Sequence, residues 1–419
     1  MVPSSRPATP YQDPFAEPLD AVLAEVALSI QLPPGLHAKA VDRYEAVRKH
    51  IERPGSPLVD RVAYFYPQGS MRIDATISTR GTDDEYDIDI VAELTGGDLS
   101  PEAMLNDLHQ ALKDYPVQKV VRQTRCVTLY YADGMHLDVT PARRTGVKEK
   151  ESEIAHAKVG VNAEPGRLVP MNAYAFGGWY TDRTPIEDAF AKAMNKRLYE
   201  QAGMVFAEAE SDDVPAQTPF IIKSVTTVAL QLLKRHRNIQ YAEATGRIPP
   251  SVLLSCHAGH AAVPGMRLSD MLIRQALWTA NAIEIAVGQR RLLSVPNPEH
   301  PGEYFTDRWP ENQDQQQTYA GKLRLLANGL ERFRKGNVQL EDLQTWMRLQ
   351  FGERVVTNSI KAFNERLGRQ VGATEQSYTK NGGLWTPSKP RIVGLTTGAA
   401  TALAPVAARA HTNMGERRD

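Results

Sequence analysis

Two aspartates, Asp87 and Asp89, stand inside an otherwise apolar strand pattern, EYDIDIVAEL. Side chains alternate between the two faces of a strand, so Ile88 and Ile90 are expected to face a core while both carboxylates share the other face. Like charges on one face repel each other, and burial penalises each of them further. A divalent cation resolves this conflict, and hard oxygen ligands suit Mg²⁺. The pair therefore predicts a strand with one buried face and a metal site on the other.

A third aspartate, Asp138, occupies an alternating pattern in the segment MHLDVTPA. Asp133 and Gly134 predict a two-residue hairpin turn that leads into this strand. If this strand neighbours the strand of Asp87, Asp138 completes a triad. Three carboxylates can hold two cations about 3.5–4 Å apart, which activate an attacking hydroxyl and stabilise the leaving oxygen in an in-line displacement.

A Gly-Ser pair, Gly69 and Ser70, precedes the Asp-x-Asp strand. Glycine permits close backbone approach and serine adds a hydroxyl, so the pair can hold a phosphate. Taken alone, either pair is typical of a solvated strand or loop, and the acidic run at 83–85 is interpreted as such a loop. The ordered set, with a third aspartate beyond an intervening helix, favours a catalytic metal site.

The remaining pattern divides the chain into a mixed first part and a helical second part. The first part is predicted to contain a helix that begins after an N-cap at Ser100 and ends near 114. Segment 151–183 is interpreted as irregular, with Gly177-Gly178-Trp179 in a loop over a cleft. Strands are expected at 119–132 and 135–142, and helices at 20–31, 36–53, 186–200, 217–239, 251–263, 267–288, 310–335, 338–350 and 353–370.

These elements predict a flexible N-terminus (1–18), an α/β lobe (19–165), a helical lobe (166–370) and a tail (371–419). The tail is rich in Gly, Thr, Ala and Pro, a composition typical of a flexible, disordered segment. No internal repeat is evident.

Composition excludes several classes of protein. Lys and Arg together number 49, as do Asp and Glu, so bulk charge gives no argument for nucleic-acid binding. Two cysteines exclude a disulfide scaffold and a cysteine-rich zinc module, and they fit a reducing cytoplasm. No membrane span is expected, because no apolar run reaches the roughly 18–20 residues that cross a bilayer.

The segments QGSMRIDATIS, DIDIV and HLDVTP resemble the polymerase-β-like nucleotidyltransferase superfamily. Further segments at 232–238, 247–259 and 295–309 resemble the helical lobe of bacterial CD-NTases, which are relatives of cyclic GMP–AMP synthase and oligoadenylate synthase. The resemblance spans roughly 40–335. It implies an α+β fold: a nucleotidyltransferase lobe with a mixed sheet, a C-terminal helical lobe and a central cleft.

The resemblance also implies an activity. Such enzymes make cyclic di- or trinucleotide second messengers from nucleoside triphosphates, with ATP expected among them, release pyrophosphate, and act in antiphage (CBASS) signalling. Alternatives within the superfamily make linear oligoadenylate or add nucleotides to RNA ends or to proteins. A non-catalytic scaffold of the same fold is a further alternative, although an intact triad argues against it.

The resemblance implies that the carboxylates bind two Mg²⁺ ions, for which Mn²⁺ can substitute. It also implies that residues of both lobes hold the donor phosphates. Asp138 is also placed to help deprotonate the attacking ribose hydroxyl. The implied metal ligands and catalytic residues are Asp87, Asp89 and Asp138, and the implied phosphate-binding residues are Gln68, Gly69, Ser70, Lys234 and Ser251.

The residues themselves leave alternatives open in the helical lobe. Lys234, Arg235 and Arg237 are expected to reach outward, and an ordinary basic helix face is an equal interpretation for Lys234 and the favoured one for the two arginines. Ser251 follows two prolines, where a plain helix N-cap is an equally good interpretation.

Partners are implied only in outline. The core is expected to be monomeric, and no double-stranded-DNA platform is evident because the zinc insertion of the animal DNA sensor is absent. The arginines at 122, 125, 143 and 144 are expected to line the nucleotide cleft or to be solvated. Leu384 and Trp385 would anchor the tail if it contacts a regulatory partner, of the E1/E2-like or HORMA type.

Overall fold

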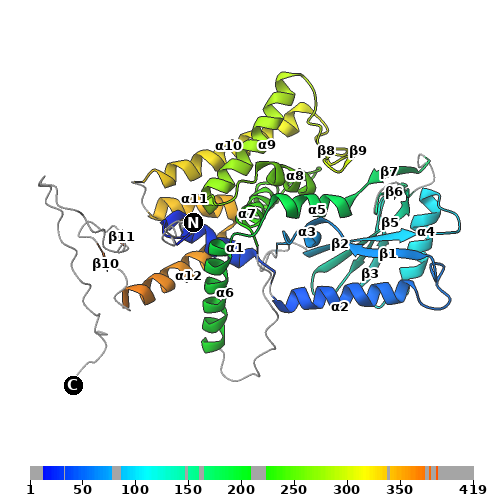
Figure 1. Ribbon diagram of the computed structural model, residues 1–419, viewed down its shortest axis with the longest axis horizontal. Coiled ribbons are helices and arrows are strands. Elements are labelled where there is room, and N and C mark those ends of the chain that lie inside the picture. The colour runs from blue at the N-terminus through cyan, green and yellow to red at the C-terminus, as the bar shows by residue number, and fades with distance from the viewer. Residues whose placement is uncertain are drawn as a thin grey trace, which may run out of the picture.

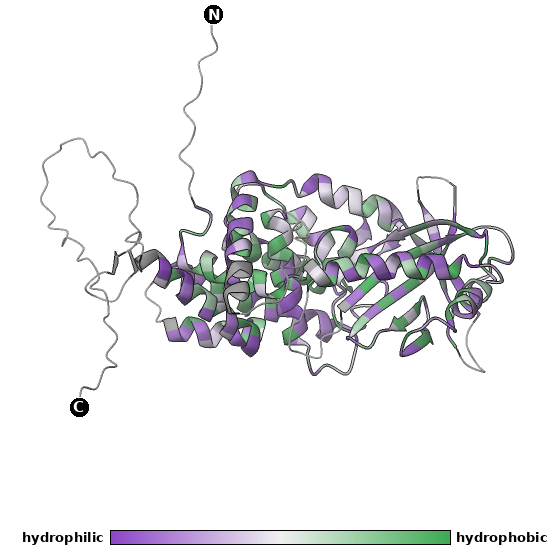
Figure 2. Cartoon of the chain, turned by 90° about the horizontal axis from the view of Figure 1, so that it is seen from below, coloured by the Kyte–Doolittle hydropathy of each residue, from purple (hydrophilic) through white to green (hydrophobic). Residues whose placement is uncertain are grey.

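The computed structural model describes residues 13–32, 34–77, 86–146, 150–159, 165–208, 223–336, 340–372, 377–378 and 384–385. Figure 1 shows the sheet and its covering helices at one end and a bundle of helices at the other, with α3 (Gly69–Arg72) and α5 (Ala173–Arg183) between them. In Figure 2, hydrophobic and hydrophilic segments alternate along the elements of both parts. The mixed architecture confirms the predicted α+β fold.

Among the described residues, the α/β lobe is built on a seven-stranded sheet. Its centre is the parallel pair β2 (Tyr86–Leu94) and β5 (Met135–Arg144), in which Asp89 lies opposite Asp138. The expected neighbourhood of the two aspartate strands is therefore confirmed. The other strands pair antiparallel and are β1 (Val62–Pro67), β3 (Lys119–Arg122), β4 (Val127–Tyr130), β6 (Ser152–His156) and β7 (Arg167–Met171).

One face of this sheet is covered by helices, as the alternation in the strands predicts. Ile88 and Ile90 share a buried cluster with apolar residues of α2 (Pro34–Ile51) and α4 (Pro101–Leu112). Ser100 caps α4 by accepting a hydrogen bond from the backbone N–H of Ala103, as expected. The opposite face carries the aspartates and is left for the helical lobe.

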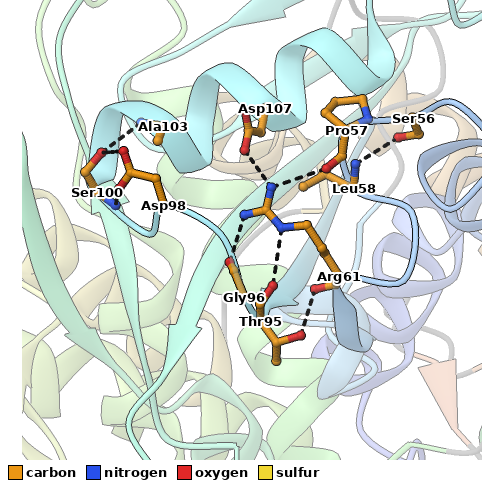
Figure 3. A network of polar contacts seen from close by, with 10 residues as sticks. All are labelled: Ser56, Pro57, Leu58, Arg61, Thr95, Gly96, Asp98, Ser100, Ala103 and Asp107. Atoms are coloured by element: carbon orange, nitrogen blue, oxygen red, sulfur yellow. Dashed lines mark hydrogen bonds and ion pairs between the residues drawn. The ribbon is translucent and has the colours of Figure 1, made fainter.

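The end of the sheet away from the aspartates is tied together by Arg61, as Figure 3 shows. Its guanidinium donates to the backbone oxygens of Thr95 and Gly96, which follow β2, and to Asp107 Oδ2 on α4 at 2.8 Å. The backbone N–H of Thr95 also donates to the Arg61 oxygen at 2.8 Å. One side chain thus links the start of β1, the end of β2 and α4.

Two predicted segments differ from the structure. The expected single strand at 119–132 is a hairpin of β3 and β4, because residues 123–126, which include the polar Gln123, Thr124 and Arg125, form the turn between them. The segment 151–183 is not irregular: it holds β6, β7 and helix α5 (Ala173–Arg183). Gly177 lies within α5, where an added Cβ would meet the Arg72 side chain at 2.5 Å, so this glycine serves close packing rather than a loop.

The helical lobe takes its core from both ends of the chain. Helix α1 (Pro18–Ile30), expected in the α/β lobe, instead shares the buried cluster of α7 (Val225–Gln240) and the later helices, and the sheet extends to Met171, past the expected boundary at 165. The other helices of this lobe are α6 (Asp188–Glu208), α8 (Ser251–Ala261), α9 (Leu268–Gly288), α10 (Gln313–Arg334), α11 (Leu340–Phe351) and α12 (Glu353–Gly372).

The apolar N-terminal region explains one membrane-like signal. The segment Pro18–Ile51 is long and apolar enough to cross a membrane by length and composition, but 69% of its most apolar window is buried inside the fold. The structure divides it into α1 and α2, which pack in different lobes. Its apolar character is therefore accounted for by core packing.

A short hairpin, β8 (Pro296–Asn297) and β9 (His300–Tyr304), was missed by the sequence patterns and packs against β7 of the sheet. In the predicted tail, the described backbone is a pairing of β10 (Ser377–Tyr378) with β11 (Leu384–Trp385). The remainder of the tail, most of the predicted flexible N-terminus and the acidic run 83–85 lie outside the described residues.

Candidate functional site

Gly69 brings the chain against the carboxylate of Asp89. It opens the short helix α3 (Gly69–Arg72) with φ of +59°, in the left-handed region that favours glycine. A Cβ at this position would lie 2.5 Å from Asp89 Oδ2. The backbone N–H of Gln68 donates to the backbone oxygen of Asp89 at 2.8 Å. The side-chain Nε2 of Gln68 lies 3.5 Å from Thr140 Oγ1. The expected Gly-Ser element is therefore next to the expected metal ligand.

The three aspartates lie on one face of the central strands, and their environments differ. Asp87 is exposed and lies 3.8 Å from His136 Nδ1, whereas Asp138 accepts a hydrogen bond from Thr128 Oγ1 at 2.6 Å. The pKa of Asp89 is raised to about 7, mainly by burial and then by the charges of Asp138 and Asp87, which outweigh the opposite effect of Lys234. Burial also raises the pKa of Asp138.

Hard oxygen donors that repel one another fit a divalent cation, which would relieve the repulsion. The carboxylates are nevertheless not gathered into a closed ligand set: within the described ranges, no three His, Cys, Asp or Glu side chains form a group that could hold a metal ion. The face and the donor chemistry match the prediction, while the side-chain arrangement of a loaded site is not formed here.

The helical lobe contributes Lys234 from α7. The ammonium is buried and donates to the backbone oxygen of Ala75, in the α/β lobe, at 2.8 Å. Burial lowers the pKa of Lys234 to about 7, and the charge of Arg237 lowers it too, while Asp89 and Asp87 act in the opposite direction. The expectation that this side chain reaches outward is wrong, because α7 is packed on several sides by α1, α8, α9 and α11.

Arg235 and Arg237 are also buried, so the basic helix face expected there does not exist. Arg235 donates to the Phe351 oxygen at 2.8 Å and is structural. Arg237 donates to Ser251 Oγ at 2.7 Å and to the Pro249 oxygen at 3.0 Å, which fixes the start of α8. Ser251 is not the N-cap, which is Pro250, so its hydroxyl is available to the cleft and to Arg237.

A cavity of about 340 Å³ joins these groups between the two lobes. This volume lies within the usual range for small-molecule sites. Seven of the eight predicted site residues line it, and the eighth, Asp138, lies beside Asp89 in the neighbouring strand. The predicted residues in the lining are Gln68, Gly69, Ser70, Asp87, Asp89, Lys234 and Ser251.

Comparison with known proteins identifies the family of this chain. Residues 20–160 match the family model of the Second Messenger Oligonucleotide or Dinucleotide Synthetase (SMODS) domain. The chain is 70% identical over 416 residues to the cyclic dinucleotide synthase CdnG of Bradyrhizobium diazoefficiens, and the alignment covers 99% of each chain. The chain belongs to the CD-NTase family. This CD-NTase is accordingly a nucleotidyltransferase.

Solved structures of CD-NTases have the same fold. The structure of B. diazoefficiens CdnG in complex with GTP superposes with a TM-score of 0.76 at 71% identity and covers 84% of this chain and 100% of the other. A CdnC:HORMA complex from Escherichia coli MS115-1 superposes with a TM-score of 0.53 at 13% identity, over 79% and 96% of the chains, and supports the fold alone. A c-di-GMP synthase of Roseivirga ehrenbergii is 22% identical over 84% of this chain and 89% of its own.

Sequence patterns missed several residues around the CD-NTase cleft. Thr128 was read as part of one long strand, although its position opposite Asp138 follows once the β3–β4 turn is recognised. Arg237 was interpreted as an ordinary surface arginine. Glu303 and Phe305 also line the cavity, and they had no signal beyond the resemblance of the segment around them.

The four arginines that were expected to line the nucleotide cleft or to be solvated are dispersed among separate partners. Arg125 pairs with Asp307 of the helical lobe and donates to His156 Nδ1 at 2.9 Å. Arg143 pairs with Glu153, and Arg144 lies over the Tyr64 ring at 5.1 Å. Arg122 donates to the Ala157 oxygen at 3.3 Å. None of the four lines the cavity of about 340 Å³, so these contacts favour structural roles over a nucleic-acid surface.

Proposed function

We propose that this CD-NTase joins two GTP molecules into a cyclic dinucleotide, with two Mg²⁺ ions and with Mn²⁺ as a substitute. One observation carries the proposal: Asp89, opposite Asp138 on parallel strands, lines one cavity with Gly69, Ser70, Lys234 and Ser251. Guanine is proposed because the 70%-identical relative is a cyclic dinucleotide synthase solved with GTP.

The residues divide the work of a phosphoryl transfer. The backbone at Gly69 and the hydroxyl of Ser70 hold the donor phosphates from one side, and Lys234 and Ser251 hold them from the other. Asp138, kept in place by Thr128, accepts the proton of the attacking ribose hydroxyl, and pyrophosphate leaves. Asp87, Asp89 and Asp138 would hold Mg²⁺, which would neutralise charge on the triphosphate. Catalysis is then mainly positioning and charge neutralisation.

We further propose that the product is a second messenger in antiphage (CBASS) signalling in the cytoplasm. A contact of the tail with a regulatory protein, of the HORMA or E1/E2-like type, is part of this proposal. The solved CdnC:HORMA complex motivates it, since that complex pairs a protein of the same fold with such a partner.

The test is incubation of the purified chain with all four ribonucleoside triphosphates and Mg²⁺ or Mn²⁺, followed by phosphatase treatment and mass spectrometry. We expect a phosphatase-resistant cyclic dinucleotide of guanine that an Asp87→Ala/Asp89→Ala variant does not make. A linear oligonucleotide, a labelled protein or a cyclic product without guanine would refute the proposal. If the chain alone forms no product, the assay is repeated with the partner proteins encoded beside it. The absence of product in that assay too would contradict the proposal.

A further inference from the structure

The cavity between the lobes has an apolar part besides its phosphate-binding part. Ile154, Met171 and Phe176 line it from the α/β lobe and α5, and Phe305 lines it from the segment after β9. The rings of Phe176 and Phe305 pack edge to face with centroids 4.9 Å apart. Apolar and aromatic walls suit the flat face of a nucleobase.

Glu303 on β9 is the carboxylate of this apolar part. Its Oε2 accepts two hydrogen bonds, from the Asn172 backbone N–H at 2.8 Å and from Asn297 Nδ2 at 2.6 Å. Asn172 directly follows Met171 and caps α5, so Glu303 lies beside the apolar wall. Within the part of the chain that the structure describes, no group donates a hydrogen bond to the other oxygen, Oε1.

A partly buried carboxylate with a free oxygen at a cavity wall is an acceptor for a ligand. Burial raises the pKa of Glu303, although the two donors lower it. Oε1 retains two lone pairs. A ligand that donates two adjacent N–H groups would therefore satisfy this oxygen in full.

We propose that Glu303 reads the Watson–Crick edge of guanine and makes this CD-NTase select GTP. This inference rests on the proposed function and deepens it. Guanine presents N1–H and the 2-amino group side by side on this edge, whereas adenine presents an amino group beside an acceptor nitrogen. A carboxylate thus matches guanine with two charge-assisted hydrogen bonds and leaves adenine with one and a repulsive contact.

The Glu303→Gln variant tests this geometry because its orientation is constrained. Both groups that contact Oε2 are donors, so the amide oxygen of glutamine must face Asn172 and Asn297. The amide NH₂ then faces the cavity, where it opposes the donors of guanine. The variant keeps the packing of β9 while it reverses the hydrogen-bonding character of the cavity wall.

Binding is measured by calorimetry on the full chain with α,β-methylene analogues of GTP and of ITP, which lacks the 2-amino group. A hydrogen bond to a charged group predicts that the native chain binds the guanine analogue about 10- to 100-fold more tightly than the inosine analogue. In Glu303→Gln we expect that ratio to fall to about 3 or less, mainly through weaker guanine binding.

Asp307→Asn is the matched control. Asp307 follows β9 and pairs with Arg125 across the lobes, but it does not line the cavity. We expect this variant to weaken the binding of both analogues equally, so that the ratio of their affinities does not change. If Glu303→Gln also weakened the binding of both analogues equally, Glu303 would only hold the lobes together. The inference would then be overturned.

The two proposals fail separately. The chain could prefer the guanine analogue over the inosine analogue through Glu303 and yet form no cyclic product. This result would support the inference and refute the proposed function. A cyclic guanine product with a ratio that Glu303→Gln leaves unchanged would do the reverse. A native chain that does not prefer the guanine analogue overturns the inference directly.

Discussion

At the scale of single residues, the closest fit in the site is between Gly69 and Asp89. Position 69 requires glycine for two reasons: its backbone is in the left-handed region, and there is no room for a Cβ beside Asp89 Oδ2. The two reasons can be separated, because Gly134 has φ of +79° and nothing within 4 Å of an added Cβ. Gly134 lies in the turn before β5 and shares the backbone strain alone.

We therefore expect Gly69→Ala and Gly134→Ala to cost similar free energy of unfolding, about 1–2 kcal/mol for the left-handed conformation. The two variants should differ in turnover. Gly69→Ala displaces the Asp89 carboxylate, so its turnover should fall by at least about 100-fold, as it does when a catalytic group is misplaced. Gly134→Ala should retain nearly all turnover. Thermal unfolding and initial rates check both, and equal turnover in the two variants would contradict the role given to Gly69.

At the scale of elements, helix α1 is held in the helical lobe by a buried charge. Glu25 is fully buried, and its Oε1 accepts from Arg197 of α6 at 2.7 Å and from Arg366 of α12 at 2.9 Å. Three helices far apart in the sequence thus meet at one carboxylate. Removing it takes the shared carboxylate from both arginines in a largely buried place, where Arg366 keeps only its pair with Glu200.

The expected loss for Glu25→Ala is about 3–5 kcal/mol of unfolding free energy, the usual cost of breaking a buried ion pair from one side. Lys361→Ala on α12 is the comparison, since Lys361 is 70% exposed and pairs with Glu365 at 3.7 Å. That exposed pair should contribute under about 1 kcal/mol. Urea unfolding of both variants checks the difference, and a loss of less than 1 kcal/mol for Glu25→Ala would show that α1 does not depend on this network.

At the scale of the whole molecule, the lobes are joined by contacts on several sides of the cavity. Lys234 and Gln231 of α7 donate to the backbone oxygens of Ala75 and Thr76. On another side, Arg125 pairs with Asp307, and Glu303 binds the N-terminus of α5. The residues proposed for the site come from both lobes, and the same contacts that close the cleft position them.

Acid should destabilise the fold through buried histidines of the helical lobe. Burial lowers the pKa of His236 and of His257 to about 3, and the His260 charge also lowers that of His257. Between pH 6.5 and 3 the unfolded chain binds protons that the folded chain does not, so stability falls as pH falls. Each histidine should cost about 2 kcal/mol between pH 7 and pH 5.

Urea unfolding across this pH range measures the effect. His257→Leu should remove about half of the contribution that His236 and His257 together make to the slope, whatever its effect on stability at pH 7. A pH dependence that does not change in this variant would contradict the neutral state assigned to His257.

The sequence alone determined the α+β class, the strand with Asp87 and Asp89, the hairpin leading to Asp138 and most of the helices. These features rest on local periodicity and on short-range chemistry: alternation marks the strands, Ser100 marks a helix start, and carboxylates that share one strand face predict a cation. The Gly-Ser pair could be assigned to the same site for a similar reason, since the backbone freedom of Gly69 is a property of the residue itself.

Tertiary structure decided what depends on contacts between distant segments. Nothing local distinguishes a basic surface helix from α7, whose Lys234, Arg235 and Arg237 are buried because other helices pack around it. The lobe of α1 was decided by partners such as Arg366, 341 residues away. Glu303 joins the cavity only because β9 packs on β7. Burial and pairing across long separations set these roles, and periodicity within a short window carries no information about them.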